Sequence, residues 1–172
     1  MQPGEHLRVV VMGVSGSGKT TVGRLLAARL GVPFADADDY HSSEAKAAMA
    51  AGHALTDRDR WPWLARLSDW LAAEPGGCVL ACSALRRAYR DVLRSRAPDV
   101  RFLHLSGEPR VVTERIAHRP DHYMPASLVG SQYETLEPLQ PDEDGVAVDF
   151  TLGPELIVDR FLDRTRRDPR RP

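Results

Sequence analysis

A glycine-rich segment near the start of the chain limits the possible folds more than any other feature. The pattern G-x-x-x-x-G-K-[ST] is matched at every position by Gly13, Val14, Ser15, Gly16, Ser17, Gly18, Lys19 and Thr20. An apolar run at 7–12 precedes it, and helix-spaced apolar residues follow from Val22. In a strand, glycine turn and helix of this kind, backbone amides and the helix N-terminus face one anion. The segment therefore predicts a phosphate-binding loop.

The residue types of the loop predict how it would hold ATP. Lys19 is expected to reach the β- and γ-phosphates, and the Thr20 hydroxyl to bind Mg²⁺. Thr21 is expected to join the loop in binding the nucleotide. A glycine-rich turn that merely carries a lysine is disfavoured because motif, strand and helix coincide. The loop leaves the reaction open, since GTPases, ATP-driven machines and small kinases all share it.

The rest of the chain alternates short apolar runs with segments of helical period, which is typical of an α/β protein with a mainly parallel sheet. About five strands are expected, at 7–12, 33–35, 78–82, 100–105 and 146–150. Helices are expected around 22–30, 64–71, 85–93 and 158–162, with another beginning near Pro109. Together these predict a three-layer, P-loop kinase-like fold. We expect a single domain over 1–172 with a charged, frayed tail from about 166.

Composition excludes several kinds of partner. A net charge of −1 gives no field that would collect nucleic acid or a membrane surface. No apolar run approaches the length of a bilayer span, which suggests a cytoplasmic location. Cys78 and Cys82 are expected on the same face of one strand, too far apart for a disulfide, as core thiols.

The length of the chain favours a compact kinase over a motor or a signalling GTPase. In such an enzyme the acceptor would be held by residues that follow the second and third strands, at the carboxyl ends of the sheet. Polar segments stand at these places, at 36–41, 55–64 and 82–91.

These segments resemble gluconokinase of the small P-loop type, over residues 11 to about 143. The matching residues are the phosphate loop; Asp38 with His41; Met49, Gly52, Leu55, Thr56, Asp57, Asp59, Arg60, Pro62, Trp63 and Leu64; Cys82 to Arg86 with Tyr89, Arg90 and Asp91; and His122, Met124, Pro125, Leu128, Ser131, Gln132, Leu136 and Glu137. The resemblance implies transfer of the ATP γ-phosphoryl group to the 6-hydroxyl of D-gluconate. It also implies a homodimer.

Residue roles follow from this resemblance and from the chemistry of an anionic polyol. Asp38 is expected to orient the reacting hydroxyl or accept its proton, with Mg²⁺ nearby, and His41 to bond a sugar hydroxyl. Three arginines are expected to hold the substrate carboxylate or the transferring phosphoryl group, namely Arg60, Arg86 and Arg90. Asp36 and Asp39 are interpreted as structural turn residues.

A polar, proline-flanked segment at 119–125 is interpreted as a mobile lid. Arg115 and Arg119 flank it and are expected to bind the nucleotide, with Arg119 bringing a catalytic cation to the γ-phosphate on closure. His122 and Gln132 would contact substrate or cap the lid. The stretch from Gln140 to Gly145 is a weak candidate for contacting adenine.

The chain departs from the family pattern at two substrate-side positions, where Ala45 and Ala48 replace a common asparagine and lysine, so acceptor choice stays open. One alternative is another small kinase, acting on shikimate or a nucleoside monophosphate. Shikimate kinases carry a glycine triplet where this chain has Cys82, Ser83 and Ala84. The other alternative is a non-catalytic ATP-binding regulatory protein.

Overall fold

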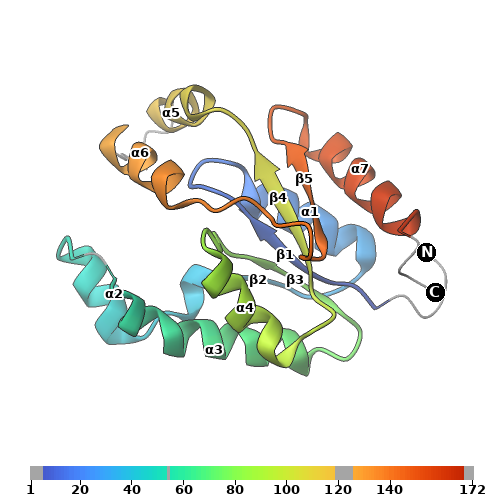
Figure 1. Ribbon diagram of the computed structural model, residues 1–172, viewed down its shortest axis with the longest axis horizontal. Helices are drawn as coiled ribbons and strands as arrows, with labels where there is room; N and C mark the ends of the chain where they lie inside the picture. The colour runs from blue at the N-terminus through green and yellow to red at the C-terminus, as the bar shows by residue number, and fades with distance from the viewer. Residues whose placement is uncertain (1–5, 54, 119–125, 169–172) are drawn as a thin grey trace.

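The computed structural model describes residues 6–53, 55–118 and 126–168. Five parallel strands form one sheet in the order β2-β3-β1-β4-β5 (Figure 1). Their bounds are Arg8–Met12 for β1, Phe34–Asp36 for β2, Cys78–Ala81 for β3, Arg101–Ser106 for β4 and Gly145–Asp149 for β5. Each lies within two residues of its predicted position; for β1, β3 and β4 the reason is that a strand buried on both faces has a nearly continuous apolar run.

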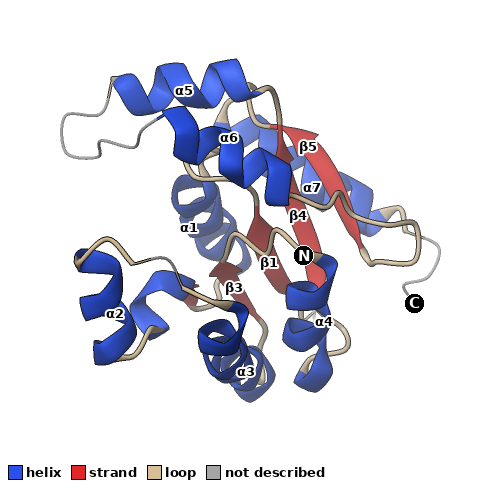
Figure 2. Ribbon diagram, turned by 60° about the vertical axis from the view of Figure 1, so that its left-hand side comes forward, coloured by secondary structure: helices blue, strands red, loops and turns tan. Residues whose placement is uncertain are grey.

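Helices cover both faces of this sheet, which gives the predicted three layers (Figures 1 and 2). One face is covered by α1 (Lys19–Leu30) and α7 (Pro154–Arg166), which pack on each other. The other is covered by α3 (Asp57–Ala73) and α4 (Arg87–Arg96). Two apolar clusters, one on each side of the sheet, form the core.

Three shorter helices frame the carboxyl ends of the strands. They are α2 (Ser43–Ala50), α5 (Pro109–Ala117) and α6 (Ala126–Thr135). The start of α5 at Pro109 was predicted, and a proline suits the first turn because its missing N–H has no intrahelical partner there. The helix α6 was not predicted. The segment interpreted as a lid, 119–125, lies outside the described residues.

The described chain continues beyond α7 as far as Asp168. Asp168 is nearly buried and its carboxylate contacts Arg101 on β4 at 2.8 Å. This ion pair joins residue 168 to the sheet; residues 169–172 lie outside the described residues, so the frayed tail stays a prediction. The thiols of Cys78 and Cys82 are free and buried, as predicted, and burial raises the pKa of each to about 12.

Candidate active site

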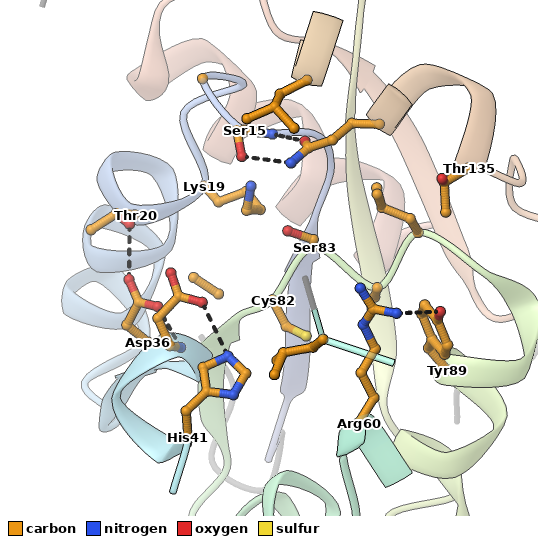
Figure 3. A pocket seen from close by; sticks show the side chains of 18 of the residues that line it. Ser15, Lys19, Thr20, Asp36, His41, Arg60, Cys82, Ser83, Tyr89 and Thr135 are labelled. Atoms are coloured by element: carbon orange, nitrogen blue, oxygen red, sulfur yellow. Dashed lines mark hydrogen bonds and ion pairs between the residues drawn. The ribbon is translucent and has the colours of Figure 1, made fainter. Parts of the chain in front are cut away.

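A cavity of about 810 Å³ opens beside the carboxyl ends of β1, β2 and β3. The phosphate loop forms one wall, and side chains from the segment after β2, from α3, α4 and α6 form the others (Figure 3). Parallel strands bring their carboxyl ends to one edge, so segments far apart in sequence meet here.

The phosphate loop takes the backbone shape that its glycines allow. Gly13 and Gly16 have φ angles of 149° and 81°. A Cβ on Gly13 would lie 2.9 Å from the carbonyl oxygen of Leu105, so a side chain does not fit there. The Lys19 ammonium is folded onto the loop, where it donates to the Gly13 and Val14 carbonyls at 3.0 Å each. Burial lowers the pKa of Lys19, while the nearby carboxylates of Asp38 and Asp36 act in the opposite direction.

Thr20 meets a carboxylate across the base of the cavity. Its hydroxyl donates to Asp36 Oδ2 at 3.2 Å, while Asp36 Oδ1 accepts the Asp38 amide at 3.0 Å. Asp36 therefore has the structural capping role assigned to it and also faces the phosphate loop, which the sequence did not reveal. A hydroxyl and a carboxylate are the hard oxygen donors that suit Mg²⁺. Within the described residues, no group of three or more His, Cys, Asp or Glu side chains could hold a metal.

Asp38 and His41 form a pair and line the cavity together with Asp36. The two side chains are 3.8 Å apart, and His41 stacks on Trp63 with ring centroids 4.2 Å apart. Trp63 in turn donates its indole N–H to the Ala37 carbonyl at 2.8 Å. Partial desolvation by the surrounding protein and the negative charge of Asp36 raise the pKa of Asp38, although its side chain remains accessible to water. Burial lowers the pKa of His41.

A third group gathers at the starts of α3 and α4. Arg60 and Tyr89 line the cavity and are bonded to each other at 3.1 Å. Asp57 accepts from both, at 3.2 Å from Arg60 and 2.6 Å from the Tyr89 hydroxyl. Arg86 lies 3.8 Å from the same carboxylate and is half-exposed. The structure thus brings two of the three predicted arginines together.

The third arginine, Arg90, is in a different environment, and its predicted role in holding substrate is corrected here. Its side chain has no exposed surface and pairs with Glu143 through two hydrogen bonds of 2.8 and 3.0 Å. Its remaining donors contact the carbonyls of Ala84 and Pro138. Helical spacing alone could not separate this inward position from that of Arg86. Arg90 supports the cavity wall from behind.

The loop after β3 is held in an uncommon conformation by this support. Ala84 has a φ of 46°, a left-handed backbone that residues other than glycine seldom adopt, and Arg90 bonds its carbonyl at 2.9 Å. The preceding residue, Ser83, accepts the Gly13 amide through its carbonyl at 3.2 Å. The wall of the cavity after β3 is thereby joined to the first residue of the phosphate loop.

Two of the residues predicted near the lid, Gln132 and Arg115, contact different parts of the phosphate loop. Gln132 on α6 accepts the Ser15 amide at 2.6 Å and donates to the Ser15 hydroxyl at 3.0 Å. Arg115 lies behind the phosphate loop, where it contacts the Gly16 and Ser17 carbonyls at 3.4 Å and that of Phe150 at 2.7 Å. Arg119 and His122 lie outside the described residues, so their predicted roles remain predictions.

Other polar cavity residues were given no role from the sequence, although all but Thr135 belong to the matched segments. They include Ser83, Tyr89, Ser131 and Thr135. Ser83 and Tyr89 stand in a matched block, and Thr135 follows Ser131 at a spacing of four on α6, which places both on one helix face. That spacing is the signal that could have found Thr135, had the helix been predicted.

A second cavity, of about 510 Å³, lies at the carboxyl ends of β4 and β5. Its lining includes Gly107, Arg110, Asp149 and Thr151. In the strand order it lies on the other side of β1 from the first cavity. The stretch from Gln140 to Gly145, considered for adenine, lines neither cavity and is instead bonded to arginines of α4.

Comparison with known proteins resolves which kinases this chain is related to. A family model described as shikimate kinase matches residues 15–140. A gluconokinase from Gluconobacter oxydans is 41% identical, with 90% of this chain and 88% of that protein covered. A crystal structure of a gluconokinase from Sinorhizobium meliloti superposes with a TM-score of 0.85 at 44% identity, covering 94% of this chain and 92% of that one. The chain belongs to the gluconokinase family.

The likeness to gluconokinases is more specific than the likeness to shikimate kinases. A shikimate kinase from Aquifex aeolicus superposes with a TM-score of 0.66 at 21% identity, over 93% of this chain and 96% of that one, which is a likeness of fold alone. The chain is thus an ATP-using P-loop kinase, as the sequence predicted. No described helix is both long and apolar enough to cross a membrane. The homodimer stays a prediction.

Proposed function

We propose that this protein transfers the γ-phosphoryl group of ATP to the 6-hydroxyl of D-gluconate, giving 6-phospho-D-gluconate and ADP. The observation that carries the proposal is one cavity with a phosphate loop on one wall and the carboxylates of Asp36 and Asp38 and the guanidinium of Arg60 on the others. Gluconate is an anionic polyol that needs cations for its carboxylate and acceptors for its hydroxyls. The names of the similar gluconokinases support the same acceptor.

The nucleotide would lie with its phosphates in the loop and its nucleoside beside β4. Lys19 is within the loop, ready to turn from the Gly13 and Val14 carbonyls to the β- and γ-phosphates. The second cavity, between the ends of β4 and β5, offers room for the nucleoside on the side away from the acceptor. Thr20, with Asp36 next to it, would hold Mg²⁺, which neutralises phosphate charge when bound.

The acceptor would lie between two groups of side chains. Asp38, flanked by His41, would orient the 6-hydroxyl toward the γ-phosphate or take its proton. Arg60 and Arg86 would bind the carboxylate at the other end of the sugar acid. Arg119 and His122 lie outside the described residues and keep their predicted roles toward the γ-phosphate and the substrate. In a loose phosphoryl-transfer transition state such positioning contributes more than base strength.

The test is an ATP-dependent assay of the purified protein over several acceptors. ADP release is measured with D-gluconate, other aldonates, shikimate and nucleoside monophosphates at matched concentrations. Gluconate is expected to give the highest kcat/KM, and mass spectrometry should find the new phosphate on carbon 6. A higher kcat/KM for shikimate or a nucleotide would refute the proposal, as would ATP binding without turnover on any acceptor.

A further inference from the structure

A single carboxylate, that of Asp57, holds Arg60 and Arg86 at the end of the cavity where the carboxylate of the acceptor is proposed to bind. It accepts the Tyr89 hydroxyl at 2.6 Å and Arg60 at 3.2 Å, and Arg86 lies 3.8 Å away. We call these four side chains the acid-end cluster. They come from the first turn of α3 and the start of α4; Arg60 and Tyr89 line the cavity, and Asp57 joins the two helices directly behind them.

The acid-end cluster carries two guanidinium charges and one carboxylate charge, which leaves one net positive charge. Tyr89 adds none, since partial burial and the bond to Asp57 raise the pKa of its hydroxyl. Hydrogen bonds from Tyr89 and Arg60, together with the charge of Arg86, lower the pKa of Asp57 and keep it ionised near neutral pH. Asp59, close by in sequence, is already bound to Thr56 in a capping box.

We propose that Asp57 makes the site prefer an acceptor whose acid group carries a single negative charge. Asp57 neutralises one of the two guanidinium charges, which leaves one positive charge. That charge matches a carboxylate and is too small to match a doubly charged group such as a phosphate ester. The inference rests on the proposed binding of gluconate at Arg60 and Arg86. The inference goes beyond that function because it identifies Asp57 as the residue that disfavours a phosphorylated sugar alcohol with the same number of carbons.

The three charged side chains of the cluster are between one-third and one-half exposed, so solvent screens their charges. For partly exposed charges a few ångströms apart, the loss of one carboxylate corresponds to about a 3- to 10-fold change in affinity for each negative charge that the ligand carries, so a dianion gains more than a monoanion by that factor. A purely structural reading assigns Asp57 only to the first turn of α3, where a carboxylate favours the helix dipole. That reading predicts a change in stability and no change in the preference between acids.

The experiment compares three ligands with the same six-carbon chain: neutral D-glucitol, singly charged D-gluconate and D-glucitol 1-phosphate. Their dissociation constants are measured by calorimetry on the wild-type protein, on Asp57→Asn and on Asp57→Glu. In Asp57→Asn, the affinity for the phosphate relative to gluconate should rise about 3- to 10-fold. Asp57→Glu should keep the wild-type preference, since it restores the charge.

Asp69→Asn is the matched control, because it removes one negative charge from the same helix at an exposed pair with Arg96. It should leave the preference unchanged. Asp57→Ser gives the same readout with another residue suited to a helix start, should Asp57→Asn fold poorly. An unchanged preference in the neutral variants overturns the role of Asp57 while leaving the proposed function intact. Failure of the wild-type protein to bind gluconate overturns the proposed function itself.

Discussion

Replacing Glu143 by glutamine should destabilise the protein more than any change to a surface ion pair. The Glu143 side chain has no exposed surface and accepts from Arg90, Arg94 and the Gln140 amide at 2.8 to 3.0 Å. Burial alone would raise its pKa, but these hydrogen bonds outweigh burial and lower the pKa from 4.5 to about 2.

Two routes give the same magnitude for this change. A pKa lowered from 4.5 to about 2 corresponds to about 3 kcal/mol of stability near neutral pH. Breaking a buried ion pair on one side, which here leaves Arg90 charged and unpaired, costs about 3–5 kcal/mol. In a chain of 172 residues, 3 kcal/mol lowers Tm by about 6–12 °C.

The assay is urea and thermal unfolding of Glu143→Gln, with Asp69→Asn as control. Asp69 pairs with Arg96 at 3.0 Å on the surface, and its loss should cost at most about 1 kcal/mol. Since the folded-state pKa of Glu143 is depressed, its contribution is complete above pH 4.5 and is lost as pH falls toward about 2. The stability of Glu143→Gln should therefore change less over that range than that of the wild type. Equal losses in the two variants at neutral pH would refute the reasoning.

Three further outcomes are expected. Lys19→Met should reduce kcat at least about 100-fold in the acceptor assay, because the ammonium held inside the phosphate loop is lost. Asp38→Asn should reduce kcat about 100-fold and leave ATP affinity within about 2-fold by calorimetry. Gly77→Ala should lower stability by at least about 1–3 kcal/mol in urea, because φ there is 93° and the added Cβ would lie 2.4 Å from the Leu7 carbonyl oxygen. Wild-type values in any of these would contradict the corresponding role.

The sheet and the phosphate loop could be predicted because their signals are local. A run such as Val9 to Val11 is buried on both faces, and Gly13 and Lys19 belong to a pattern with one backbone solution. By contrast, α6 has few strongly apolar residues, so no helical period in the sequence marks it.

The candidate site was harder to predict because its partners are distant in sequence. Arg86 and Arg90 stand one helical turn apart in one matched block, yet Arg86 is half-exposed and Arg90 is buried against Glu143. Arg86 is the N-cap residue of α4, at the exposed end of the helix, whereas Arg90 lies one turn further in and meets a partner 53 residues away. Asp57 was likewise in a matched block, but its significance comes from Tyr89, 32 residues further on.

The hydrogen bond from the Gly13 amide to the Ser83 carbonyl links the two halves of the proposed reaction. One end belongs to the segment that would grip the phosphates, and the other to the segment beside the sugar acid. Because β1 and β3 are also paired along their length, neither segment can shift along the sheet without the other. The distance between the phosphoryl donor and the hydroxyl would then be set by the sheet. The helices around the site would only have to exclude water.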